Sequence, residues 1–280
     1  MSQKTNQTGE VGRAIQILLN GCNGRMGQVF SRVAARYPDV VIAAGLDIAP
    51  PPGPAAGGPP PGAGASYPVY REAAEIRETV IDVIVDFSHP SALDAVLALA
   101  ADRGIPAVLA TTGYSDPQLA AISQAAAHTP IFQSANMSVG INLMAELIRK
   151  AASALAEGFD IELIEKHHNQ KVDAPSGTAL LLADAMNDEL SGDRTYTYDR
   201  HSVRAKRGKK EIGIHAVRGG TIVGEHTVLF AGNDEILEIR HSSASREIFA
   251  EGALRAARFM TVADRAPGRY SMSDILNGGL

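Results

Sequence analysis

The sequence predicts an α/β protein: a doubly wound parallel sheet followed by a second, α+β domain. Two observations support this fold class. In the first half of the 280-residue chain, near-continuous apolar segments alternate with helical patterns. After Val139 the apolar segments begin to alternate with polar residues. Strands buried on both faces of a parallel sheet are continuously apolar, whereas strands with one wet face alternate.

The first half provides the parallel sheet. AIQILLNG at 14–21 predicts a buried strand, and RMGQVFSRVAARY at 25–37 predicts the helix that follows it. Because crossovers between parallel strands are right-handed, the helices are expected to cover both faces of the sheet. The further strands predicted are 40–47, 80–88, 105–113 and 130–135, and the helices between them are 91–104 and 116–128.

The segment PPPGPAAGGPPPGAGA at 50–65 interrupts this pattern. Its prolines and glycines prevent regular structure, which predicts a surface loop or a disordered insert. A proline-rich ligand for another protein is an alternative, but the segment lacks flanking basic residues.

The second half predicts a smaller domain with a mostly antiparallel sheet. Its pattern begins with a long amphipathic helix, and Gly219-Gly220 is expected to form a hairpin turn between two of its strands. The predicted helices are 141–158, 177–190 and 245–260, and the predicted strands are 160–168, 210–220, 221–232 and 235–243.

Composition excludes several classes of protein. A net charge of −5 and the absence of Trp argue against a nucleic-acid-binding protein. Cys22 is the single cysteine, so neither an intramolecular disulfide nor a Cys-based zinc site can form. No apolar run approaches the roughly 18 residues of a membrane span, and the first ten residues lack a secretory apolar core. We expect a soluble cytoplasmic protein.

A glycine-rich turn, NGCNGRMGQ at 20–28, joins the first strand to the first helix. Its spacing is G-x-x-G-x-x-G, with Cys22 where the strict motif has its first glycine. Such a turn brings backbone N–H groups to a pyrophosphate at the helix start. Asp47 lies at the end of the second strand, about 20 residues beyond the last glycine, as expected for a ribose-binding carboxylate. Together they predict a Rossmann-type dinucleotide-binding domain.

The identity of the cofactor depends on Asp47 and its neighbour. A carboxylate that binds ribose hydroxyls favours NADH, and Ile48 is not an arginine that would pair with a 2′-phosphate. NADPH stays possible, since Arg25 in the glycine turn can hold a phosphate. Loops after two later strands are expected to flank the nicotinamide, through Thr111, Thr112, Ala135 and Asn136.

The stretch EKHHNQKVDAPSGTA at 165–179 predicts the reactive site. A histidine can donate a proton when hydride adds to an unsaturated substrate, and Lys171 can bind a carboxylate. The helix predicted at 177 starts with free N–H groups beside the hydroxyls of Ser176 and Thr178, which together form a carboxylate-sized anion site. A capped helix beside a wet strand end is the alternative.

Other polar features are less specific. His201, His215, His226 and His241 lack metal-ligand spacing, and we expect no metal. Glu225 and His226 are either site residues or strand surface. The basic segment 200–210 predicts a solvated loop that attracts an anionic substrate, with a nucleic-acid patch as the alternative.

Taken together, these motifs resemble the 4-hydroxy-tetrahydrodipicolinate (dihydrodipicolinate) reductase family of lysine and diaminopimelate biosynthesis. The resemblance covers nearly the whole chain from about Ile15, except the Pro/Gly insert. The E-x-H-H-x-x-K-x-D-x-P-S-G-T-A pattern is its most specific part. The motifs that carry it are GCNGRMG (21–27), DFSHP (86–90), ATTGY (110–114), SANMSVGINL (134–143), EKHHNQKVDAPSGTA (165–179) and RGGTIVGEHTVLF (218–230).

The resemblance implies an NAD(P)H-dependent oxidoreductase that reduces 4-hydroxy-tetrahydrodipicolinate, a cyclic dicarboxylate, to tetrahydrodipicolinate with loss of water. It implies His167 as proton donor and Lys171 as its partner. Substrate carboxylate would be bound by His168, Lys171, Ser176, Gly177 and Thr178. The dinucleotide would be held by Gly21, Cys22, Asn23, Gly24, Arg25, Met26, Asp47, Ala110, Thr111, Thr112, Ser134, Ala135, Asn136 and Met137.

The resemblance also implies the domain arrangement: 1–138 with 249–280 for the dinucleotide, and 139–248 for substrate and tetramer formation through the second sheet. Two alternatives stay open. A homoserine or aspartate dehydrogenase type would have no use for a dicarboxylate clamp beside paired histidines. A redox-sensing NAD regulator would need a DNA-reading element, and no helix-turn-helix pattern is evident.

Overall fold

The computed structural model describes residues 13–49, 67–155, 157–263 and 265–278, which form two compact units. Unit 1 comprises Met1–Ala135 and Ala253–Ser271, and unit 2 comprises Asn136–Gly252 and Met272–Leu280. The Pro/Gly insert predicted at 50–65 lies outside the described residues.

The two units differ from the expected domains chiefly at the C-terminal end of the chain. The C-terminal helix α7 (Met272–Gly278) groups with unit 2 instead of the first domain. It packs there against α4 (Val139–Leu155), where Ser273 Oγ donates a hydrogen bond of 2.8 Å to Glu146 Oε1.

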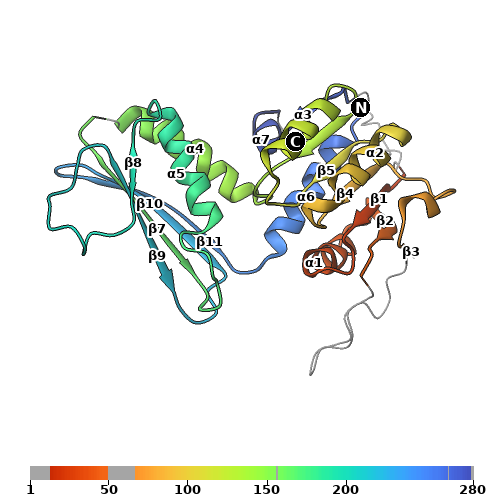
Figure 1. Cartoon of the computed structure of the whole chain (residues 1–280), viewed down its shortest axis with the longest axis horizontal. Helices are drawn as coiled ribbons and strands as arrows, with labels where there is room; N and C mark the ends of the chain where they lie inside the picture. Colours follow the sequence, from red (N-terminus) through yellow and green to blue (C-terminus); the bar gives the residue numbers. More distant parts are fainter. Residues whose placement is uncertain (1–12, 50–66, 156, 264, 279–280) are drawn as a thin grey trace, which may run out of the picture. The chain divides into compact units, whose positions relative to one another are not determined.

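Unit 1 is built on a seven-stranded sheet in which every pairing is parallel (Figure 1). The spatial order is β12-β6-β5-β4-β1-β2-β3, so the chain fills one side of β1 and then crosses to the other. Ligands of such sheets bind at the carboxyl ends of the strands, near this reversal. The strands are β1 (Ile15–Asn20), β2 (Val40–Leu46), β3 (Val69–Tyr70), β4 (Val83–Asp86), β5 (Ala107–Leu109), β6 (Pro130–Gln133) and β12 (Gly268–Tyr270).

Helices cover both faces of this sheet, as the continuously apolar strands predict. On one face α2 and α3 pack against strand residues such as Leu18 and Leu109. On the other face the ring of Phe132 meets Phe259 of α6, with centroids 6.4 Å apart. The helices that contribute to unit 1 are α1 (Arg25–Ala34), η1 (Ala73–Glu75), η2 (Pro90–Ala92), α2 (Leu93–Arg103), α3 (Asp116–Ala125) and the C-terminal part of α6 (Glu247–Met260).

Unit 2 contains a five-stranded mixed sheet in the order β11-β10-β7-β9-β8, covered on one face by α4 and α5 (Gly177–Glu189) (Figure 1). β10 pairs antiparallel with β7 and β11, whereas β9 pairs parallel with β7 and β8. The strands are β7 (Asp160–His167), β8 (Thr195–Thr197), β9 (Glu211–Arg218), β10 (Gly224–Ala231) and β11 (Ile236–Ser243).

This topology corrects two expectations. The sheet is mixed, not mostly antiparallel, and Gly219-Gly220 is not a hairpin turn, because β7 lies between β9 and β10. Instead, the β9–β10 connection passes the end of β7, where Gly219 N–H donates to the carbonyl of His167 and Asn169 N–H to that of Gly220. The loop therefore fixes the backbone at the predicted reactive strand end.

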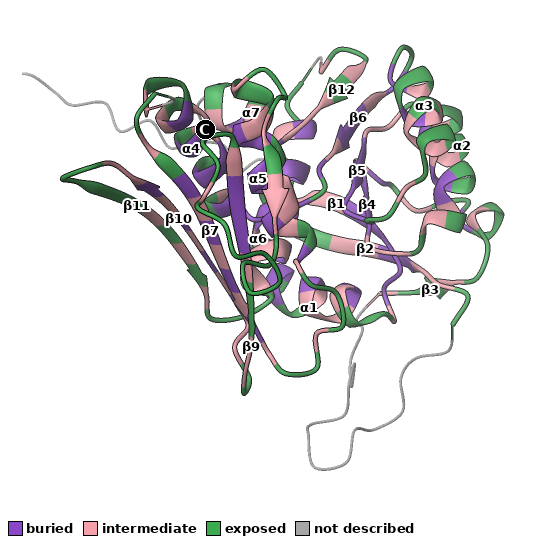
Figure 2. Ribbon diagram, turned by 60° about the vertical axis from the view of Figure 1, so that its left-hand side comes forward, coloured by how far each residue is buried: buried purple, intermediate pink, exposed green. Residues whose placement is uncertain are grey.

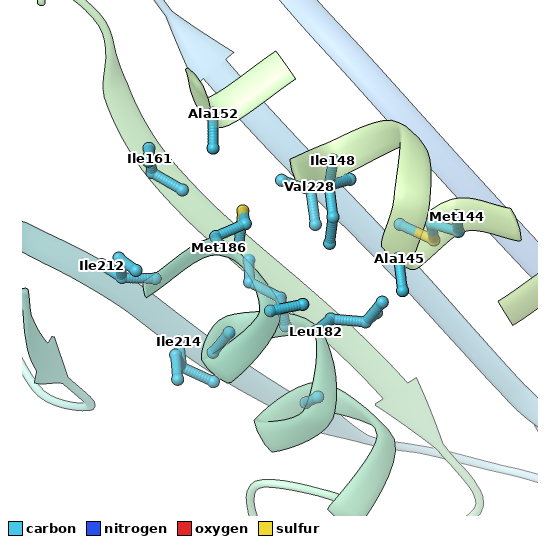
Figure 3. Close-up of a cluster of buried hydrophobic side chains, with 14 of the residues drawn as sticks. Met144, Ala145, Ile148, Ala152, Ile161, Leu182, Met186, Ile212, Ile214 and Val228 are labelled. Carbon is cyan, nitrogen blue, oxygen red and sulfur yellow. The ribbon is translucent and has the colours of Figure 1, made fainter. Parts of the chain in front are cut away.

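Alternation along β7 and β10 divides this sheet into an inner and an outer face (Figure 2). The inner face packs on the two helices, and its apolar cluster is shown in Figure 3. Members of that cluster include Met144 and Ile148 from α4, Leu182 and Met186 from α5, and Val228 from β10. At the carboxyl end of β7 the inner positions become polar, with Glu165 and His167 buried in line with Ile161 and Leu163. Buried ionisable groups at the end of an apolar face are typical of a functional site.

Candidate active site

In unit 1, the glycine turn after β1 brings backbone segments too close together for side chains. Gly21 has φ +78°, and a Cβ on Gly27 would lie 2.2 Å from the carbonyl oxygen of Gly21. The first turn of α1 therefore lies directly on the strand end, as close helix–strand packing requires.

The start of α1 is open to an anion. Gly24 is its N-cap and supplies no side-chain hydrogen bond, and the first turn holds no acidic residue. Gly24 and Arg25 are exposed, and Met26 is half-buried. Uncapped N–H groups at an exposed helix start fit a pyrophosphate.

Asp47 links this turn to the end of β2. Its Oδ2 accepts the N–H of Asn23 and its Oδ1 the N–H of Ala49, both at 2.9 Å. The Asn23 side chain donates back to the carbonyl of Ala49 at 2.8 Å. Burial, followed by the charge of Asp47, raises the pKa of the Cys22 thiol to about 11, so that residue stays neutral. The half-buried carboxylate lies where a ribose-binding group is expected, so these residues fit a dinucleotide.

Asp86, at the end of β4, organises the neighbouring loops. It is 1% exposed, and its oxygens accept hydrogen bonds from Asn20 Nδ2 at 2.8 Å and from the hydroxyls of Ser88 at 2.5 Å and Thr111 at 2.8 Å. The Thr111 hydroxyl is thus engaged with Asp86, while Thr112 is exposed and Ala110 is buried. The sequence signal for Asp86 was the DFSHP motif, from which no role was predicted.

The segment 134–137, predicted to hold the dinucleotide, divides between the two units. Ser134 is buried and Ala135 exposed in unit 1. Asn136 belongs to unit 2, where its Nδ2 donates to Thr178 Oγ1 at 3.0 Å, and Met137 beside it is buried. A residue predicted for the cofactor therefore contacts one predicted for the substrate.

Within unit 2, the polar side chains of the inner face gather on Glu165. Its side chain has no exposed surface, and its two oxygens accept four hydrogen bonds. Arg218 donates two, from Nη1 to Oε2 at 2.7 Å and from Nη2 to Oε1 at 2.8 Å. His167 Nδ1 lies 2.7 Å from Oε2, and the N–H of Ser176 donates to Oε1 at 3.0 Å. We call Glu165, His167, Ser176, Arg218 and His226 the Glu165 cluster.

His226 from β10 completes the cluster. Its ring stands edge-on to that of His167, with centroids 5.3 Å apart, and its Nε2 lies 3.2 Å from Ser176 Oγ. Burial is the main cause that lowers the pKa of His226 to about 4; the neighbouring His167 adds to this effect, and the charge of Glu165 opposes it. His226 is therefore neutral near pH 7 and holds Ser176 without a charge of its own.

Ser176 is the N-cap of α5, with its Oγ accepting the N–H of Ala179 at 3.1 Å. Beyond it, Gly177 is exposed, and a Cβ there would meet no atom within 4 Å. Thr178 is half-buried. The helix start is consequently open, and its N–H groups can bind a carboxylate.

The loop from β7 to α5 carries the remaining predicted residues. Lys171 Nζ pairs with Asp173 Oδ1 at 2.8 Å, and its side chain is 21% exposed. The N–H of Lys171 donates to the carbonyl of His168, whose side chain is half-buried just past the strand. Only His167 of the histidine pair thus joins the Glu165 cluster.

Glu165, Arg218 and His226 received no definite role from the sequence. Alternation supplies the signal: Glu165 and His167 share a face, and His226 shares a face with Val228 and Phe230. Glu225, the other open candidate, lies on the outer face and pairs with Lys166 and Arg240.

Among residues 13–49, 67–155, 157–263 and 265–278, no group of three or more His, Cys, Asp or Glu is arranged to hold a metal ion. None of the helices placed in those ranges is long and apolar enough to cross a membrane.

Comparison with known proteins identifies the family. Residues 15–137 match the family model described as dihydrodipicolinate reductase, N-terminus, and residues 140–276 match the corresponding C-terminus model. A 4-hydroxy-tetrahydrodipicolinate reductase from Caldanaerobacter subterraneus subsp. tengcongensis is 46% identical over 95% of this chain and 99% of its own length. A protein of the same name from Clostridium novyi is 44% identical over 93% of this chain and 98% of its own.

A solved structure agrees. The dipicolinate-bound dihydrodipicolinate reductase from Paenisporosarcina sp. TG-14 superimposes with a TM-score of 0.76 at 25% identity, covering 94% of this chain and 99% of that one. Because the two family models together match residues 15–137 and 140–276, the alternative dehydrogenase and regulator hypotheses are excluded. This chain belongs to the 4-hydroxy-tetrahydrodipicolinate (dihydrodipicolinate) reductase family.

Proposed function

We propose that the Glu165 cluster and the adjoining start of α5 are the acid and carboxylate-binding parts of the family's reaction. As a family member, the chain is an NAD(P)H-dependent oxidoreductase of lysine and diaminopimelate biosynthesis, which reduces 4-hydroxy-tetrahydrodipicolinate to tetrahydrodipicolinate. The observation that carries the proposal is that one carboxylate, Glu165, binds both His167 and the backbone of Ser176. Glu165 thereby holds the proposed proton donor, His167, next to the proposed anion site at the start of α5.

Reduction of the substrate needs a hydride and a proton, and the 4-hydroxyl group leaves as water. The bound nicotinamide supplies the hydride. We assign the proton to His167, which is held by Glu165 and is 9% exposed, so that it is shielded from bulk water. Lys171 assists it and also binds carboxylate. Its ion pair with Asp173 lies at the surface and can be exchanged for one with substrate at little cost.

We assign a substrate carboxylate to the start of α5. The N–H groups of Gly177 and Thr178 are the first of the helix, and the absence of a side chain at Gly177 leaves space above them. The hydroxyls of Ser176 and Thr178 are near, and His168 lies on the same loop. The dipicolinate in the Paenisporosarcina structure is a planar dicarboxylate, which supports this class of ligand.

We assign the dinucleotide to the glycine turn 21–26, Asp47, the loop 110–112 and the segment 134–137. We propose NADH as the preferred cofactor and NADPH as a second one. Asp47 offers a carboxylate at the end of β2, and Ile48 after it is 85% exposed and uncharged. Asp47→Ala is expected to lower kcat/KM for NADH more than for NADPH. Equal losses with the two cofactors would contradict the assignment of Asp47.

We also propose a cytoplasmic homotetramer that forms through the outer face of the unit 2 sheet. Its charged side chains are largely paired with one another there, as in the Glu162–Arg200 and Glu225–Arg240 pairs. On the same face, Val217 of β9 and Ile236 of β11 are 43% and 64% exposed. Exposed apolar side chains among charges that are already paired suit a contact between copies. Sedimentation equilibrium tests it, and a monomer at micromolar concentration would refute it.

The test of the reaction is a coupled assay. Purified protein is expected to oxidise NADH when given the condensation product of pyruvate and aspartate semialdehyde, and not with either compound alone. No turnover with NADH or with NADPH on that substrate would end the proposal. Kinetics with the two cofactors side by side settle the preference.

A further inference from the structure

Glu165 is a carboxylate with every acceptor position filled. An ionised carboxylate has about four lone-pair positions, and Glu165 receives two bonds from Arg218, one from His167 and one from the N–H of Ser176. Its side chain has no contact with water. A carboxylate enclosed in this way cannot itself bind substrate, so its effect must act through its partners.

The charge of Glu165 is secured by those partners. Burial raises the pKa of the carboxyl group, but the hydrogen bonds from Arg218, His167 and the Ser176 N–H outweigh it, and the net pKa lies below its usual range. An ionised carboxylate only accepts hydrogen bonds, so the proton between Oε2 and the ring must lie on His167 Nδ1. The reactive nitrogen of His167 is then Nε2. It faces Gly224, where a Cβ would come within 3.1 Å, and the glycine leaves room beside it.

We propose that Glu165 is the positioning residue of the acid His167, and that Arg218 keeps Glu165 ionised and aimed. This inference rests on the assignment of His167 as proton donor. The carboxylate fixes the Nδ1–H tautomer, orients the ring, and stabilises the imidazolium that carries the transferable proton on Nε2. The same carboxylate holds Ser176 at the start of α5, so the acid and the anion site share one anchor.

Other charged groups around His167 do not replace this effect. His226, on the neighbouring strand β10, has a pKa of about 4 and is neutral near pH 7. Lys171 is paired with Asp173 on the loop, and Arg218 on β9 is bound to Glu165. Glu165 is the anion in direct contact with the ring, among the partners that the structure gives to His167.

Replacement of Glu165 by glutamine separates positioning from packing. Each oxygen of Glu165 accepts one hydrogen bond from Arg218 and one from a second group. At Oε1 the second group is the N–H of Ser176, which can only donate, whereas at Oε2 it is His167 Nδ1, which can become an acceptor. The amide nitrogen therefore takes the Oε2 position and points to His167 Nδ1. It donates there, which moves the ring proton to Nε2 and removes the charge that stabilises the imidazolium.

The matched control is Glu162→Gln. Glu162 lies three residues earlier on β7, on the outer face, and also binds one histidine, His215 at 2.7 Å, and two arginines. The Glu162→Gln variant shows any general effect of removing a carboxylate from β7. Size-exclusion chromatography shows whether this substitution alters assembly.

The first readout is the dependence of kcat on pH in the coupled assay. For Glu165→Gln the fall of kcat on the alkaline side is expected to begin about one pH unit or more lower than in the wild type. At pH 8, kcat drops roughly 10-fold or more while KM stays within about 3-fold, because the anchor of Ser176 is kept. Glu162→Gln keeps the wild-type profile. An unshifted profile in Glu165→Gln would overturn the proposal, as would an equal shift in the control.

The second readout needs no activity and no variant at Glu165. Long-range ¹H–¹⁵N spectra of the unliganded wild-type protein, with His167 assigned by its loss in His167→Gln, report which ring nitrogen keeps the proton when the ring is neutral. Nδ1–H is expected, and Nε2–H would overturn the proposal. Since this measurement involves no substrate, failure of the coupled assay would count against the proposed function and leave the result for Glu165 standing.

Discussion

Strand β7 carries two carboxylates whose partners share their chemistry but whose surroundings differ. Glu162 on the outer face accepts hydrogen bonds from Arg200, Arg207 and His215, at 2.7 to 2.9 Å. Glu165 on the inner face accepts from an arginine and a histidine at similar distances. The Glu162 side chain is 22% exposed, and the Glu165 side chain is not exposed at all.

The difference shows that a carboxylate with arginine and histidine partners does not by itself mark an active site. Burial raises the pKa of both carboxyl groups, and in both the donors outweigh it, so both pKa values are lowered. What distinguishes Glu165 is the N–H of Ser176, which ties it to an open helix start.

The largest effect is expected from the arginines. Arg218→Leu leaves a fully buried carboxylate without its cation, which typically costs about 3–5 kcal/mol of unfolding free energy. Arg200, with a side chain 38% exposed, makes a surface pair. Arg200→Leu should therefore cost about 1 kcal/mol or less. Urea unfolding followed by circular dichroism measures both, and equal costs would show that the two carboxylates are energetically alike.

The pH dependence of the unfolding free energy tests whether His226, on the inner face, is buried in its neutral form. The pKa of His226 is lowered to about 4, whereas an unfolded histidine titrates near 6.5. Between these values the unfolded state binds the extra proton, so stability is full above about pH 6.5 and is lost as the pH falls toward 4. The loss amounts to about 3 kcal/mol. In His226→Gln the decrease in unfolding free energy from pH 7 to 4, measured by urea unfolding, should be smaller by that amount, and an unchanged decrease would contradict a buried neutral His226.

The sequence predicted the framework better than the site. Continuous apolar runs predicted the core strands of unit 1, but short polar strands such as Thr195–Thr197 and Gly268–Tyr270 have no periodic signal. The hairpin predicted at Gly219-Gly220 was wrong because β7 lies between β9 and β10, which are adjacent in sequence, and no local pattern records this.

Within the site, the histidine, lysine and helix-start motif was visible in one stretch of sequence. The ion pair between Glu165 and Arg218 was harder to predict. These residues are 53 positions apart in the sequence and meet only through the parallel pairing of β7 and β9. His226 is brought to them by the antiparallel register in which it faces Glu165. Such long-range pairs depend on the sheet register and not on spacing within a motif.

Replacement of the two histidine partners, His167 and His215, tests whether Glu165 positions a catalytic acid. His167→Gln is expected to lower kcat on the order of 10²-fold or more, as loss of a positioned acid typically does. His215→Gln removes the equivalent partner of Glu162 and should change kcat less than about 2-fold, because a surface hydrogen bond has little effect on a distant reaction. Both are measured in the coupled assay. Full activity of His167→Gln would refute the role of His167.

The smallest effect is expected at Ser176, where the inner cluster meets α5. Its hydroxyl accepts the N–H of Ala179 and contacts His226 Nε2, so Ser176→Ala removes an N-cap and should lower the free energy of unfolding by about 1 kcal/mol. Ser176→Thr keeps a hydroxyl and should retain most of that stability. Because the N–H of residue 176 still reaches Glu165 in both variants, kcat is expected to change less than about 3-fold, while KM rises in the alanine variant as the helix start loosens. A large loss of kcat in Ser176→Ala, with KM unchanged, would mean that the hydroxyl takes part in the chemistry and that the division between an acid anchored by Glu165 and a separate carboxylate site is wrong.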